Sequence, residues 1–95
     1  MAVRILIKRP APDDKVDTLR ELIDKLRSGS TAQTGYISGE TMRRIDPPGE
    51  LMVISKWKTR QDWQRWFESA ERSRLQRRID ELLDAPTTYE IYEYD

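Results

Sequence analysis

Aromatic residues followed by a polar pair are the part of this sequence whose spacing could support chemistry. Trp63 and Trp66 lie three positions apart, so on a helix they share one face. Arg72 and Gln76 are one helical turn apart in the segment that follows. A guanidinium and an amide on one face can donate hydrogen bonds to a substrate oxyanion held beside aromatic walls. The pattern therefore indicates a candidate site for an aromatic molecule that carries negative charge on oxygen.

The same residues also have purely structural interpretations, which the sequence alone favours. A tryptophan buries a large area, so Trp57 and Trp66 are expected to pack in the core. Core packing does not prevent Trp66 from also lining a ligand pocket. Arg72 and Gln76 could lie on a solvated helix face, because acidic residues alternate with the basic ones from 71 to 81.

Tyrosines in the expected strands are further candidates. Tyr36 or Tyr89 could donate a hydrogen bond to a bound phenolate, although packing with a solvated hydroxyl is the commoner role. Glu40 could act as a base only if it were buried, and we expect it to lie exposed on an edge strand. Ser38 and Ser55 have no His or Lys in a triad-like pattern, so we assign them no catalytic role.

Composition restricts the possible partners. The 17 Lys and Arg residues balance 17 Asp and Glu residues, which argues against nucleic acid or an anionic membrane as partner. The chain has no His and no Cys, so it lacks the commonest metal ligand and any disulfide. No run approaches the roughly 20 apolar residues of a membrane span. We expect one domain, residues 1–95, in a cytoplasmic protein.

Periodicity predicts a strand–helix–strand–strand–helix–strand order. Alternation indicates strands at 2–8, 36–45, 51–58 and 87–94, and 3.6-residue periodicity indicates helices from 16 to 26, from 59 to 67 and from 69 to 83. Asp13 or Asp14 is expected to cap the first helix, which fades through 28–30, while Thr59 and Ser69 cap the later ones. The segment 46–50 (DPPGE) predicts the turn of a hairpin. This order is typical of an α+β, ferredoxin-like βαββαβ fold with an antiparallel sheet.

Both faces of the predicted sheet carry apolar residues, whereas both helices cover the same face. Leu6 lies opposite Val3 and Ile5 on the first strand, and Met52 and Ile54 lie opposite the apolar side of the third. A second copy could cover the remaining face, so we predict a homodimer through the sheet face, which forms a dimeric α/β barrel. A single solvated face with scattered apolar residues is the alternative.

Longer segments resemble the antibiotic biosynthesis monooxygenase (ABM) domain family across essentially the whole chain. They are TGYISGE at 34–40, VISKWKTRQDWQRWFESAERSRLQ at 53–76 and PTTYEIYEY at 86–94. The matching elements are a Gly-Tyr that opens the second strand, a Trp that ends the third, an aromatic three residues before Trp66, and a Ser that opens the next helix. The resemblance implies a homodimeric α/β barrel with a pocket between the sheet and helices of each protomer.

Some members of that family oxidise phenols or hydroquinones with molecular oxygen and without a metal or organic cofactor. Haem-degrading relatives instead use an Asn on strand one and a helical His that ligates iron. In this chain the His position falls at Gln76 and strand one offers only Ile5 or Ile7, so the resemblance excludes the haem-degrading type.

The resemblance and the residues together predict a cofactor-independent monooxygenase that acts on a small aromatic or quinol. The predicted catalytic residues are Trp66, Arg72 and Tyr36, and the predicted substrate-binding residues are Trp57, Trp66, Gln76 and Tyr89. No cofactor is expected. A non-catalytic module that binds a small hydrophobic ligand or only dimerises, and an isomerase on the same scaffold, are the alternatives, because a fold does not fix a function.

Overall fold

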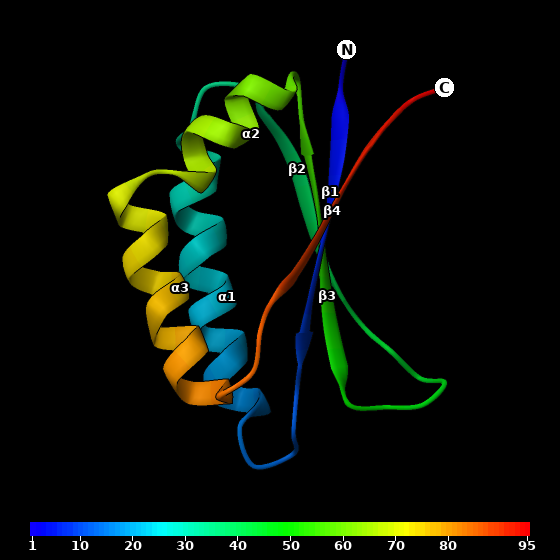
Figure 1. Ribbon diagram of the computed structural model, residues 1–95, viewed down its shortest axis with the longest axis vertical. Coiled ribbons are helices and arrows are strands. Elements are labelled where there is room, and N and C mark those ends of the chain that lie inside the picture. Colours follow the sequence, from blue (N-terminus) through cyan, green and yellow to red (C-terminus); the bar gives the residue numbers. More distant parts are fainter.

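A four-stranded antiparallel sheet with helices on one side forms the molecule, and the computed structural model describes all residues from 1 to 95 (Figure 1). The predicted order is confirmed, and the second helical region consists of two helices, as predicted. The elements are β1 (Val3–Pro10), α1 (Val16–Thr31), β2 (Tyr36–Arg43), β3 (Glu50–Trp57), α2 (Arg60–Phe67), α3 (Ala70–Leu83) and β4 (Thr88–Glu93).

The sheet has the strand order β2-β3-β1-β4, so β3 and β1 occupy its centre and β2 and β4 form its edges. The predicted hairpin is confirmed, because β2 and β3 pair antiparallel with Arg43 opposite Leu51. A bulge between Tyr36 and Ser38 interrupts this ladder. The sheet is open and does not close into a barrel within one chain.

Strand β1 ends two residues later than predicted, at Pro10 instead of Lys8. Its alternation continues past Lys8, and Arg9 faces the helices in phase with Ile5 and Ile7. Pro10 has no N–H to donate, but it lies beyond the last β4 pair, at Thr88, and faces only β3. A proline at a strand end is tolerated where one side of the ladder is empty.

The limits of α1 differ from the prediction at both ends. Neither Asp13 nor Asp14 caps the helix, because a turn closed by Lys15 N and Pro12 O (2.9 Å) separates them from its first residue, Val16. At the other end the helix continues to Thr31 instead of fading at 28–30. The hydroxyl of Ser30 donates to the carbonyl oxygen of Arg27 (2.8 Å), so this buried side chain finds its hydrogen-bond acceptor within the last turn of the helix.

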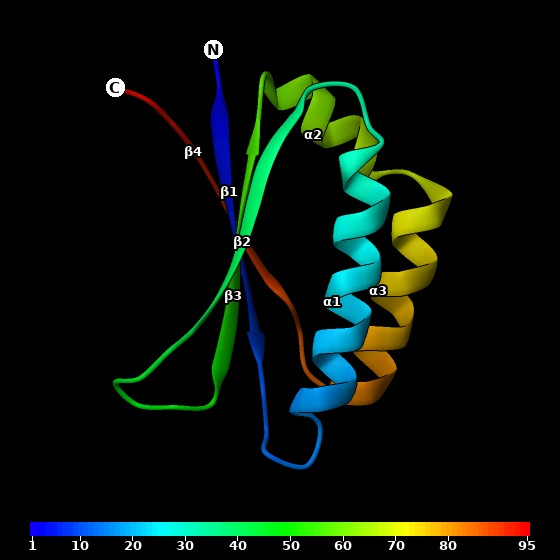
Figure 2. The same cartoon turned by 180° about the vertical axis from the view of Figure 1, so that it is seen from behind.

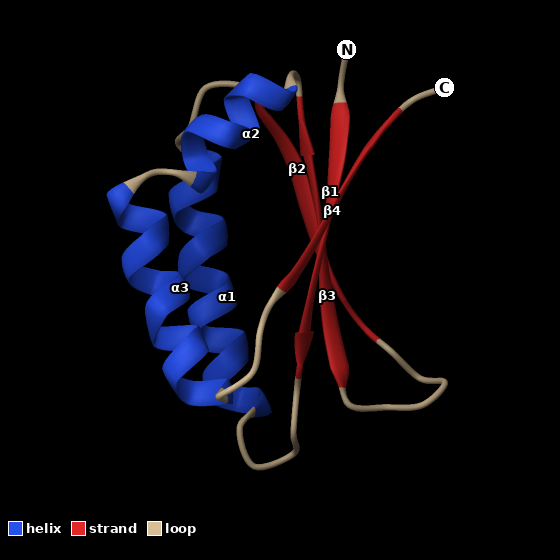
Figure 3. Ribbon diagram, in the orientation of Figure 1, coloured by secondary structure: helices blue, strands red, loops and turns tan.

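The caps of α2 and α3 are as predicted. Thr59 Oγ1 accepts from Asp62 N (3.1 Å), and Ser69 Oγ accepts from Arg72 N (3.2 Å). Each bond satisfies one of the amides that a helix start leaves free. The Ser69 cap lies at the sharp change of direction between α2 and α3, which is visible in Figure 3.

All helices lie on one face of the sheet and leave the other face bare (Figure 2). The bare face carries apolar residues from each strand, including Leu6, Met42, Met52, Ile54 and Tyr92. It also carries charges, among them the Lys8–Glu90 ion pair (2.9 Å), so it is less uniformly apolar than predicted. None of the helices has the length and apolar character of a membrane span.

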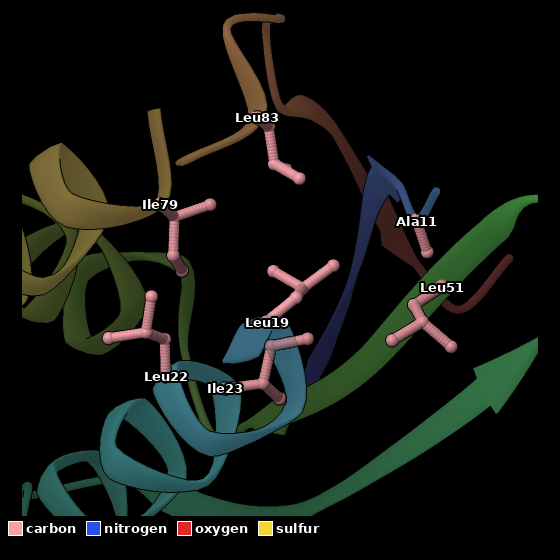
Figure 4. Packing of buried hydrophobic residues seen from close by; sticks show 7 residues of the cluster. All are labelled: Ala11, Leu19, Leu22, Ile23, Leu51, Ile79 and Leu83. Atoms are coloured by element: carbon pink, nitrogen blue, oxygen red, sulfur yellow. The ribbon is translucent and has the colours of Figure 1, made fainter. Parts of the chain in front are cut away.

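The buried apolar residues form two clusters between the sheet and the helices. The first joins α1 and α3 to the sheet and consists of Ala11, Leu19, Leu22, Ile23, Leu51, Ile79 and Leu83 (Figure 4). The second lies nearer α2 and consists of Val3, Ile5, Ile7, Trp57, Trp63 and Trp66. Leu26 and Val53 pack against both clusters. The border between the clusters is therefore the natural place for a gap in the packing.

Candidate functional site

A partly open cavity of about 40 Å³ lies at this border between the two clusters. All three helices and the strands β1, β2 and β3 contribute to its walls. The lining residues are Ile7, Arg9, Ile23, Leu26, Arg27, Ser30, Tyr36, Gly39, Val53, Ser55, Trp63, Trp66 and Arg72. The cavity thus has aliphatic and indole walls with a few polar groups, which is the usual composition of a small-molecule site.

Trp66 forms one wall, held close to α1 by a glycine. Its side chain is 4% exposed. A Cβ added to Gly29 would lie 2.7 Å from the indole Cη2 and would also meet the carboxylate of Glu71. No larger residue fits at position 29 without displacing the indole ring. The sequence therefore fixes the position of Trp66 through Gly29.

Arg72 enters the cavity from the first turn of α3 and is 6% exposed. Its guanidinium donates to the carbonyl oxygen of Phe67 (3.2 Å) and to the hydroxyl of Tyr89. It also stacks on the Phe67 ring, with Cζ 4.2 Å from the ring centre. These contacts with Phe67 and Tyr89 orient the guanidinium group, but both partners are neutral, so neither compensates its charge.

Arg9 enters the cavity from the sheet side and is 2% exposed. Its Nη2 donates to Oε1 of Gln76 (2.9 Å). Gln76 in turn donates to Asp80 Oδ1 (2.8 Å) and to Thr87 Oγ1 (2.9 Å). Arg9 Nε is buried and has no hydrogen-bond partner. The amide of Gln76 therefore positions the guanidinium and leaves one donor unused.

The cavity is electropositive, because three arginines line it and no Asp or Glu does. Burial lowers the pKa of Arg9, and the neighbouring Arg72 charge lowers that pKa further, whereas Tyr89 raises it. Burial likewise lowers the pKa of Arg72. An anion placed between these guanidinium groups would relieve both the desolvation and the mutual repulsion.

Tyr36 and Arg27 lie on the side of the cavity between β2 and α1. A Cβ on Gly39 would come within 2.6 Å of the Tyr36 hydroxyl, so this glycine lets the phenol lie flat over β2. Arg27 Nη2 donates to Thr41 Oγ1 (3.2 Å) at the exposed edge. Arg27 also borders a shallow groove between α1 and β2, which makes this side the accessible entrance.

The three residues predicted to be catalytic come together in the structure. Trp66, Arg72 and Tyr36 all line the cavity. The interpretation of Arg72 and Gln76 as members of a solvated helix face was wrong, since both are buried. Glu40 is exposed on the edge strand β2, as expected.

The other predicted substrate-binding residues lie outside the cavity lining. Trp57 is fully buried in the core, where its Nε1 donates to Ser55 Oγ (2.7 Å) and its ring meets Tyr36 edge-on (5.4 Å). Gln76 and Tyr89 lie behind Arg9 and Arg72, bonded to their guanidinium groups. Their contact with this cavity is therefore through the two arginines.

Arg9 is one of two arginines of the site, with Arg27, that the sequence prediction missed. The prediction ended β1 at Lys8 because of the prolines that follow. A signal was present, however, since Arg9 continues the i, i+2 alternation of Val3, Ile5 and Ile7. An arginine on the buried face of a central strand is unusual enough to indicate a site.

The cavity as it stands is smaller than an aromatic substrate requires. About 40 Å³ holds a few atoms, whereas sites for drug-sized ligands span about 300–1,000 Å³. A ring could enter only if side chains at the entrance move. Arg27 is half-buried and held there by one exposed hydrogen bond, so it is the wall residue that can move most easily.

Fold and site together define a ferredoxin-like α+β protein with a cavity between its sheet and its helices. The family model for antibiotic biosynthesis monooxygenases matches residues 2–78, most of the chain. The protein therefore belongs to the antibiotic biosynthesis monooxygenase family, which confirms the resemblance drawn from the sequence. A sequence comparison with curated proteins gives no match.

Solved structures share this fold over nearly the whole chain. A protein of Methanosarcina mazei Go1 is 21% identical, covers 100% of this chain and 94% of its own, and superposes with a TM-score of 0.90. Rv0793 from Mycobacterium tuberculosis is 20% identical over 99% and 95%, with a TM-score of 0.86. SnoaB, a cofactor-independent oxygenase from Streptomyces nogalater, is 11% identical over 99% and 93%, with a TM-score of 0.82. At these identities the likeness shows the fold.

Proposed function

We propose that this protein is a cofactor-independent monooxygenase that oxidises a small phenolic or quinol substrate in the cavity between sheet and helices. The observation that carries the proposal is the cavity itself, walled by Trp66 and supplied with hydrogen-bond donors by Arg72 and Tyr36. Family membership supports the reaction class, and SnoaB is a neighbour with a described oxygenase activity.

The cavity chemistry favours the anion of a phenol. Buried Arg72 places positive charge where a phenolate oxygen would lie, and Tyr36 provides a second donor at the entrance. An electron-rich phenolate can transfer an electron to oxygen directly, so the protein needs to bind, orient and desolvate it. For an anthrone-type substrate the reaction balances without an added reductant: the CH2 group and O2 give C=O and water.

Oxygen consumption tests this proposal. The purified protein is mixed with a panel of hydroquinones and anthrone-like phenols in an oxygen electrode. We expect oxygen uptake above the protein-free rate with at least one compound, with uptake lost in Trp66→Ala and kept in Arg74→Ala, an exposed position on α3. Uptake at the protein-free rate across the panel would contradict the proposal.

A second candidate is a non-catalytic module that binds a small aromatic ligand. The lining favours it in one respect, because it contains no carboxylate and the chain has no His to act as a base. If the protein is inert across the panel yet binds one of its compounds, this candidate replaces the first. An isomerase on the same scaffold would give a product of unchanged composition and would need no oxygen.

We also propose that the bare sheet face pairs with a second copy of the chain. Met42 and Tyr92 on this face are 50% and 55% exposed in one chain, and Leu6 and Ile54 lie beside each other at its centre. A symmetric partner would bury these apolar groups, and a small domain gains from such burial.

Sedimentation equilibrium tests the dimer. We expect twice the chain mass of 11.3 kDa at micromolar concentration. Ile54→Glu, which places a charge at the centre of the face, should give the monomer, whereas Arg74→Glu on the opposite side should leave the dimer intact. A monomeric wild-type protein would refute the proposed pairing.

A further inference from the structure

The strongest unexplained feature of the cavity is the unused donor of Arg9. The side chain is 2% exposed, and its Nε has neither a protein partner nor access to bulk water. Native interiors rarely leave a buried polar group unpaired, and an unpaired charged group is especially costly. Arg9 lines the cavity, although its Nε is covered by neighbouring atoms, so an acceptor could reach Nε only in a bound state in which the side chains around it move.

The charges at this end of the cavity point to the nature of that acceptor. Arg9 and Arg72 line the same cavity without a carboxylate beside them, and the nearest acid bonded to this network, Asp80, is reached only through Gln76. Asp80 acts on both guanidinium groups and raises the pKa of each, but this single carboxylate faces two buried cations. A negatively charged oxygen would satisfy the donor and compensate the charge together.

We infer that Arg9 and Arg72 form a subsite for an anionic oxygen and that the substrate is an aromatic acid, bound as its phenolate or carboxylate. The inference rests on the proposed function in that it names the substrate class of the same cavity. Arg9 is the specificity-determining residue, because Arg72 already has Phe67 and Tyr89 as partners. The volume of about 40 Å³ suits the acidic group, and the ring then extends past Trp66 toward the entrance at Arg27.

Binding of three ligands with the same ring tests the inference. Calorimetry without oxygen compares 2-naphthoate, 2-naphthol and the neutral 2-naphthamide on the full chain. We expect naphthoate to bind at neutral pH at least about tenfold more tightly than the amide, a difference of about 1.4 kcal/mol. Naphthol should bind more tightly as rising pH ionises it, whereas naphthoate binding should stay constant, so the two arms separate phenolate from carboxylate recognition.

Variants then locate the subsite. Arg9→Met should weaken naphthoate binding at least about tenfold and leave naphthamide binding unchanged, a difference that a loss of structure would not produce. Arg9→Lys, which keeps the charge but not the Nε donor, should give an intermediate loss and replaces Arg9→Met if that variant does not fold. Arg74→Met, an exposed arginine on α3, is the matched control and should bind as wild type.

Three outcomes would overturn the subsite: equal binding of naphthamide and naphthoate, wild-type naphthoate affinity in Arg9→Met, or no binding of either acid. The oxygenase proposal fails separately. If naphthoate binds through Arg9 but no phenol consumes oxygen, the subsite stands and the oxygenase assignment falls. If phenols are oxidised at equal rates by wild type and Arg9→Met, the oxygenase assignment stands and the subsite falls.

Discussion

Replacing Arg9 by methionine should weaken the binding of an anionic ligand at little cost to the fold. Methionine keeps most of the aliphatic volume and removes a buried charge that has one neutral partner and an unpartnered Nε. Replacing buried charged groups by apolar ones is often neutral or stabilising by about 1–4 kcal/mol. Against this gain, Gln76 Oε1 loses its donor, which costs about 1–3 kcal/mol. We therefore expect a free energy of unfolding within about 1 kcal/mol of wild type.

Urea unfolding followed by tryptophan fluorescence measures this change through linear extrapolation. Ile79→Ala is the reference, because Ile79 is 0% exposed and its truncation leaves a cavity that should cost about 2–5 kcal/mol. A loss of more than about 3 kcal/mol in Arg9→Met, the cost of breaking a buried ion pair, would show that Arg9 is structural. The reasoning that assigns it to ligand binding would then be refuted.

Three further predictions follow from local geometry. Gly29→Ala should lower the free energy of unfolding by about 1 kcal/mol, measured by urea titration. Overpacking against Trp66 costs about 1–3 kcal/mol, which outweighs the helix-propensity gain of about 1 kcal/mol. In a Trp66→Leu background, where the indole is gone, Gly29→Ala should become stabilising. Ser69→Ala should lower it by about 0.5–2 kcal/mol through loss of the α3 cap, and an unchanged value would contradict the cap. The Lys56 ammonium and the Arg4 guanidinium, whose Nε donates to the Tyr94 hydroxyl (3.1 Å), lower the pKa of Tyr94. Its phenolate therefore stabilises the fold above the ordinary tyrosine pKa, and that contribution is lost as pH falls through the lowered value. Ultraviolet titration should show this early ionisation, and Tyr94→Phe should abolish it.

The sequence predicted the order of the elements because each has a strong local signal. Period-two alternation in the strands and the hydroxyls of Thr59 and Ser69 at helix starts act within a few residues, so tertiary packing had little to change. The prediction of element ends failed where pairing with a strand distant in sequence sets the end of an element. Strand β1 can reach Pro10 because β4 stops pairing with it at Thr88, and the residues around the proline carry no signal of where that pairing ends.

The site was predicted only in part, because the residue type of an aromatic side chain indicates burial, whereas the residue type of an arginine or glutamine indicates exposure. Trp66 was recognisable from its type and spacing. Arg72 and Gln76 were read as a solvated face, although they continue the stripe of Ile79 and Leu83 at i, i+4, i+7 and i+11, and all four are buried. Burial of the polar members depends on Arg9, which reaches Gln76 from a strand 67 positions away.

The central claim, that an anionic aromatic molecule occupies the cavity between sheet and helices, is tested most directly by a crystal structure of the protein with 2-naphthoate. The account predicts the carboxylate within hydrogen-bond distance of Arg9 Nε, the ring against Trp66, and Arg27 displaced from Thr41. Naphthoate bound only elsewhere on the surface, with the cavity walls unmoved, would contradict it.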